Sequence, residues 1–165
     1  MVKTLAPMGS DDATELEGIA TVAAEFYDLL SKIRPELGKL TPTERRVVRE
    51  NLVVDSAVMM HGYAALMKDF NRQMPLEGSK KALSYWQERL QRFSKSHLYR
   101  FDGFEGDLFE KANPLWQTVG VVKPGRDGKL TVLNTGAAQS ECARVLRQLV
   151  ALDERPNNLK FLANR

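Results

Sequence analysis

Apolar residues recur every three or four positions through most of the chain, which is the spacing of amphipathic helices. The first series runs from Leu16 to Ile33 and predicts a helix of about twenty residues. Ser10 or Asp11 can cap its N-terminus, and Pro35 ends it.

The clearest helix start in the sequence lies at Thr41. Pro42 follows at the first helical position and Glu44 comes three residues after Thr41, which is the pattern of a capping box with proline in its preferred place. This predicts a second helix to about Glu50. Residues 52–70 are apolar on most faces, so we expect a central helix there, covered by the others.

The pattern changes in the second half of the chain. Residues 79–93 have the spacing of another amphipathic helix, whereas residues 94–113 lose the periodicity and predict an ordered loop pinned by phenylalanines. Two β-prone runs, 117–122 and 129–134, predict a hairpin with a six-residue loop. A last helix is expected over residues 136–152.

These segments predict one mainly helical domain, with four to five helices around a central apolar helix and one small β-hairpin near the C-terminus. The domain is expected over residues 11–152, with the hairpin at about 117–134. Residues 1–10 are expected to form a flexible leader and residues 153–165 a loosely ordered tail. A chain of 165 residues, 43% hydrophobic and 27% charged, has the size and composition of a single globular domain.

Cysteine content and hydropathy indicate the cellular compartment of the protein. Cys142 is the only cysteine, so no internal disulfide is possible and nothing indicates an oxidising environment. No apolar run approaches the ~20 residues of a membrane span, and the first ten residues do not resemble a signal peptide. We therefore expect a cytoplasmic protein with no membrane partner.

Charge is distributed unevenly along the chain, although the net charge is only +3. Residues 11–36 carry seven acids against Lys32 and Arg34, whereas residues 79–100 are basic. A basic face attracts phosphates, so this run and the last helix predict a nucleic-acid-binding surface. Its candidate residues are Lys80, Lys81, Arg89, Arg92, Lys95, Arg100, Arg144 and Arg147. The alternative is that these are ordinary solvated helix faces.

Motifs for catalysis or cofactor binding are not evident. His61 and His97 are the only histidines, no Cys/His cluster has zinc spacing, and no glycine-rich phosphate loop is present. We expect no metal, no cofactor and no catalytic set. His61 is expected to be a hydrogen-bonded core residue of the central helix.

Two single residues remain open to a structural or a functional interpretation. Asp55 stands among apolar residues and needs a partner, for which Arg45, Arg46 and Arg49 are near in sequence. The alternative is a functional acid whose pKa is raised by burial. Cys142 is expected to be a buried structural thiol; the alternative is a thiolate activated by a helix N-terminus.

Four acids between Asp102 and Glu110 lack the ligand order of a calcium loop.

Five pieces of the sequence follow one another in a suggestive order. They are residues 25–30 (Glu-Phe-Tyr-Asp-Leu-Leu), residues 39–46 (Lys-Leu-Thr-Pro-Thr-Glu-Arg-Arg), Gly62 in the apolar helix, residues 113–116 (Asn-Pro-Leu-Trp) and residues 133–136 (Leu-Asn-Thr-Gly). This order resembles the C-terminal half of the DndB family, the DGQHR-domain proteins associated with bacterial DNA phosphorothioate modification. The motif Asp-Gly-Gln-His-Arg and the N-terminal half that contains it are absent.

The resemblance implies a DNA-associated, regulatory role in a modification or defence locus, and it identifies no DNA-contacting residue. Together with the basic run, it makes a nucleic-acid-associated regulatory or accessory domain our leading hypothesis. The alternative is a protein-interaction module that completes a larger assembly through exposed aromatics of residues 101–116. An enzyme ranks third, because no nucleophile–base set is visible.

Overall fold

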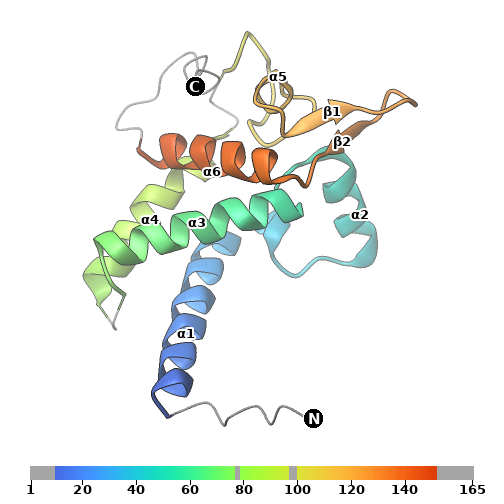
Figure 1. Cartoon of the computed structure of the whole chain (residues 1–165). Coiled ribbons are helices and arrows are strands. Elements are labelled where there is room, and N and C mark those ends of the chain that lie inside the picture. Colours follow the sequence, from blue (N-terminus) through green and yellow to red (C-terminus); the bar gives the residue numbers. More distant parts are fainter. Residues whose placement is uncertain (1–9, 77–78, 97–99, 152–165) are drawn as a thin grey trace, which may run out of the picture.

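The computed structural model describes residues 10–76, 79–96 and 100–151. This part of the chain is mainly helical with one small antiparallel hairpin, as predicted (Figure 1). Ser10 begins the first helix; the rest of the predicted leader and the tail 153–165 lie outside the described residues. The elements are α1 (Ser10–Ile33), η1 (Pro35–Leu37, a 3₁₀ helix), α2 (Pro42–Asn51), α3 (Ala57–Gln73), α4 (Lys80–Ser94), α5 (Pro114–Thr118), β1 (Val122–Pro124), β2 (Leu130–Val132) and α6 (Gly136–Ala151).

The capping box of α2 is confirmed. The Thr41 hydroxyl accepts a hydrogen bond from the Glu44 backbone N–H at 3.3 Å, and the Glu44 carboxylate accepts one from the Thr41 N–H at 2.8 Å. These hydrogen bonds hold the pKa of Glu44 below its ordinary value, because they favour the ionised carboxylate.

The helix predicted over residues 52–70 begins later than expected, at Ala57. The backbone of Leu52 instead bridges to Glu110, and the Val53 N–H donates to the Phe109 carbonyl at 2.9 Å. Ser56 then caps the new helix by accepting from the Met59 N–H. The apolar residues at the start of this run are thus used to attach the 101–113 loop, so that α2 and α3 are separate helices.

The prediction that this helix is apolar on most faces was also wrong in part. In α3 the buried face is formed by Val58, Met59, Gly62, Tyr63, Leu66 and Phe70. The opposite side exposes Ala57, His61, Ala64 and Lys68 to solvent. The helix is therefore central but amphipathic, and His61 is not a core residue.

The core is built on the packing of α3 against α6, which run side by side in the middle of the molecule (Figure 1). A Cβ atom placed on Gly62 would lie 2.6 Å from Leu146 Cδ1 and 3.1 Å from Cys142 Sγ. The absence of a side chain at this position therefore permits the close approach of the two helices. On the other side, Phe26 of α1 meets Phe70 and Trp86 edge-on, with both ring-centroid distances at 6.2 Å.

The segment before the hairpin also differs from its prediction. Residues 117 and 118 end α5, whose start is capped by Asn113: its side chain accepts from the Leu115 N–H at 3.0 Å. The strands pair Val122 with Val132 and Pro124 with Leu130, which leaves a loop shorter than the six residues predicted. The Asn-Pro start favoured a helical turn over the β-propensity of the residues that follow.

Candidate functional site

The candidate basic surface lies on α4 and α6, which pack against each other. Lys80 and Lys81 are exposed at the first turn of α4, whereas Lys95 and Arg100 are half-buried near or beyond its other end. A helix of 15 residues is about 22 Å long. Lys80 and Lys81 therefore lie at one end of α4 and Lys95 at the other, with Arg100 beyond the helix, so the structure does not gather these four cations in one site.

The packing does bring Arg89 of α4 and Arg147 of α6 together, although they are far apart in sequence. Both line a hollow of about 320 Å³, which they share with Asp69 of α3. Arg147 Nε donates to Asp69 Oδ2 at 2.6 Å. Arg89 donates to the Val150 carbonyl at 3.4 Å, and its guanidinium lies 5.4 Å from the centre of the Tyr85 ring. These contacts fix both guanidinium groups at the seam between the two helices.

The remaining two candidate arginines, Arg144 and Arg92, differ in their contacts. Arg144 pairs with Glu141 at 2.9 Å and donates to the Gln148 side chain at 2.8 Å, both within α6. Arg92 is half-buried, and its Nε atom has no hydrogen-bond partner among the described residues. The basic surface thus combines exposed lysines with arginines that are held by neighbouring groups.

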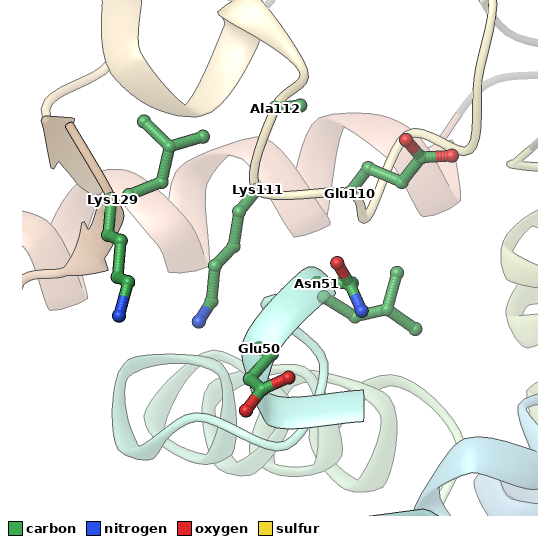
Figure 2. Close-up of a pocket in the computed structure, with 8 residues that line it drawn as sticks. Glu50, Asn51, Glu110, Lys111, Ala112 and Lys129 are labelled. Atoms are coloured by element: carbon green, nitrogen blue, oxygen red, sulfur yellow. The ribbon is translucent and has the colours of Figure 1, made fainter. Parts of the chain in front are cut away.

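A second hollow, of about 740 Å³, lies between the end of α2, residues 110–112 and β2. Figure 2 shows the side chains of Lys111 and Lys129 pointing into this hollow, which Glu50 also lines. The Lys111 ammonium donates to the Arg49 carbonyl, and its burial lowers its pKa. Lys111 therefore serves as a cap on the C-terminus of α2, where a cation is favoured by the helix dipole.

A third hollow, of about 770 Å³, is mostly apolar and opens between α1 and the C-terminal half of α3. Its lining includes Ile19 and Val22 of α1 and Met67 of α3. Ile19 is 53% exposed, and among the described large hydrophobic residues only Val47, at 51%, is comparably exposed.

Asp55 has the structural role that its surroundings predicted. Its carboxylate accepts from Arg49 Nε at 2.9 Å and lies 3.6 Å from Arg45 Nη1. Because it sits in the turn before α3, the carboxylate reaches back to α2 and ties the two helices together. The third candidate partner, Arg46, pairs with Glu50 instead, at 3.5 Å.

Sequence reasoning missed Arg34, which is the only buried cation among the residues whose burial the structure describes. Its guanidinium donates to Ser96 Oγ at 2.7 Å, to Asp107 Oδ2 at 2.9 Å and to Glu36 Oε1 at 2.9 Å. It also lies 4.9 Å from the centre of the Phe109 ring. Two of these partners are 62 and 73 residues away, so no local pattern could have identified the network. Arg34 joins the end of α1 to α4 and to the 101–113 loop.

The aromatics of residues 101–116 are not the exposed surface that the interaction hypothesis required. Phe101, Phe109 and Trp116 are buried, and Phe109 stacks on Trp116 with ring centroids 6.1 Å apart. The Trp116 indole N–H donates to the Leu108 carbonyl at 2.6 Å. The loop is thus folded onto its own aromatic core, where Phe104 alone of these aromatics is half-buried, so the prediction that they are exposed is wrong.

Cys142 is a buried thiol, as expected. Burial raises its pKa to about 12, which keeps it protonated at neutral pH. Its sulfur lies 3.1 Å from that of Met59, inside the α3–α6 contact. A protonated, enclosed thiol packs as a small apolar side chain and is not a nucleophile.

The described residues contain no group of three or more His, Cys, Asp or Glu side chains that could hold a metal ion. No helix in the described ranges is both long enough and apolar enough to cross a membrane. Comparison of the chain with known protein families, with characterised proteins and with solved structures finds no match.

Proposed function

We propose that the protein is a nucleic-acid-associated accessory domain, which contacts the phosphate backbone through α4 and the adjoining part of α6. The observation that carries the proposal is the packing of α4 on α6, which places Arg89 and Arg147 at one hollow. Lys80 and Lys81 extend the basic surface at the start of α4. Arginine and lysine side chains along a helix neutralise successive phosphates and give binding that weakens with salt.

The resemblance to the DndB family supports DNA as the nucleic acid and a regulatory role in a modification or defence system. The site itself supports backbone contact only. Its side chains lie along α4 and at the contact between α4 and α6, and several of its arginines already bond to groups of the protein. Contacts of this kind fix position on a duplex and carry no sequence information. We therefore expect little sequence preference for the isolated domain.

The test is binding of the protein to a random-sequence DNA duplex at about 50 and about 200 mM salt, followed by fluorescence anisotropy. Changing Lys80, Lys81 and Lys95 to Glu together should weaken binding at least about tenfold at low salt and reduce the salt slope by about three. The side chains of these three lysines make no hydrogen bond or ion pair with another described residue, so the variant should melt like the parent. Arg89 and Arg147 are left unchanged because they bond to other helices.

The matched control changes Lys123, Arg126 and Lys129 of the hairpin to Glu. These three side chains are exposed, and the control lowers the net charge by the same amount at a different place. It should weaken binding only about threefold, through the overall field. Equal losses in both triple variants would contradict an interface on α4, and no binding by the parent at low salt would contradict the function.

A further inference from the structure

The apolar hollow between α1 and α3 has the form of a groove for a helix. Its walls are Ile19 and Val22 of α1 on one side and Ala64 and Met67 of α3 on the other, with Leu76 at one end. At about 770 Å³ it is the largest of the three hollows described above. An isolated exposed isoleucine is ordinary, but here it belongs to a continuous apolar wall.

In the N-terminal half of α1, residues 17–21 are not covered by the rest of the described chain. Of the α1 side chains that the structure describes, those from Glu17 to Thr21 are all exposed and the first buried one is Phe26. Figure 1 shows this half of α1 projecting away from α3 and α4. Most helical stability in proteins comes from packing of an amphipathic face, so a bound partner would stabilise this segment.

Charge indicates the chemistry of that partner. The sequence of α1 contains six carboxylates against Lys32, a net charge of −5. Glu25 follows Thr21 by four residues and therefore lies on the groove side of the helix. Of the described residues that line the groove, one is basic, Lys68. A second copy of this chain would bring another acidic α1 to the same place, and a nucleic acid would bring phosphates; like charges disfavour both.

We propose that this groove binds an amphipathic helix of another protein, with an apolar face that fills the groove and Lys or Arg residues along its edges. Docking of an amphipathic helix in a hydrophobic groove is a recurrent mode of peptide recognition, in which apolar anchors at helical spacing provide the affinity. Basic edges would meet the carboxylates of α1 and set the specificity. The groove is separate from the basic surface of α4 and α6, so this interaction does not depend on nucleic-acid binding.

The test uses a synthetic helical peptide of about five turns as the probe, with Leu on one face and Lys on the others. Calorimetric titration measures its binding to the whole protein and to two variants with the same change. Ile19→Lys removes an apolar anchor from the groove wall and adds a repelling charge. Val47→Lys makes the same change at the other exposed large hydrophobic position, on α2. Both positions are exposed, so both variants should fold, which circular dichroism checks.

The parent should bind the Leu/Lys peptide, and Ile19→Lys should weaken binding at least about tenfold, whereas Val47→Lys should change it less than about twofold. A peptide with Glu in place of Lys should bind at least about tenfold more weakly than the Leu/Lys peptide. Absence of binding by the parent, or equal losses in both variants, would overturn the proposal. Concentration-dependent dimerisation of the parent that Ile19→Lys abolishes would also overturn it, because a second copy would then occupy the groove.

Discussion

The central helix α3 packs against α6 on one side and against α1 on another, and these two contacts differ in how completely they are packed. Against α6 the approach is so close that Gly62 leaves no room for a Cβ atom. Against α1 the contact is complete only at the Phe26 end, and beyond it the helices enclose the apolar groove. The α3–α6 contact is closely packed and buried. The α1–α3 contact is packed at the Phe26 end and open to solvent at the groove.

The difference shows that similar amphipathic patterns can have different structural roles. Both α1 and α6 carry apolar residues at helical spacing. In α6 seven residues of that pattern are buried, whereas in α1 Ile19 remains half in solvent. An apolar helix face that no other segment of the chain covers is available to bind another protein. The same substitution should therefore have unequal effects on the two sides of α3.

The largest expected effect comes from introducing an aspartate at the α3–α6 contact and, for comparison, at the groove between α1 and α3. Met59→Asp, on the α6 side, would bury an unpaired carboxylate in the core, so we expect it to abolish soluble expression. Ile19→Asp, at the open groove, leaves its carboxylate in water and should melt within a few degrees of the parent. Soluble yield and thermal unfolding by circular dichroism measure both. A well-folded Met59→Asp variant would show that the α3–α6 contact is not the core.

The next effect concerns the attached end of α1, which Arg34 holds. Arg34→Ala would leave Asp107 and Glu36 without their cation, and loss of one partner of a buried pair costs about 3 kcal/mol or more. Arg147→Ala is the control, because the Arg147 side chain is 49% exposed against 5% for Arg34, and a solvated ion pair is worth less than about 1 kcal/mol. Urea denaturation gives both free energies of unfolding. Equal losses would mean that Arg34 is not the residue that anchors α1.

The smallest effect compares two glycines within helices. Gly62→Ala would force Leu146 and Cys142 to move, whereas a Cβ atom on Gly18 of α1 would meet nothing within 4 Å. Both changes raise helix propensity by about 1 kcal/mol, so the difference between them isolates packing. We expect Gly62→Ala to be less stable than Gly18→Ala by about 1–3 kcal/mol, measured by urea denaturation. Identical stabilities would show that the α3–α6 contact yields as easily as the open groove.

The sequence by itself determined the features that depend on neighbouring residues. The fold class, the capping box at Thr41, the burial of Trp86 and Phe93 on α4, and the hairpin all follow from local spacing and turn chemistry. The partner of Asp55 was also predictable, because Arg49 lies six residues away. At residues 117–118 two local signals competed, the β-prone run and the Asn113 cap, and no local rule decides between them.

Only the tertiary structure decided which faces are covered and which distant residues meet. Arg34 bonds to groups 62 and 73 residues away, and Arg89 and Arg147 line one hollow only because α4 packs on α6. The pattern of α1 predicts an apolar face but not whether another helix covers it, because helical periodicity depends on each helix alone. Burial depends on how all the helices are arranged, which is why the groove on α1 was not visible in the sequence.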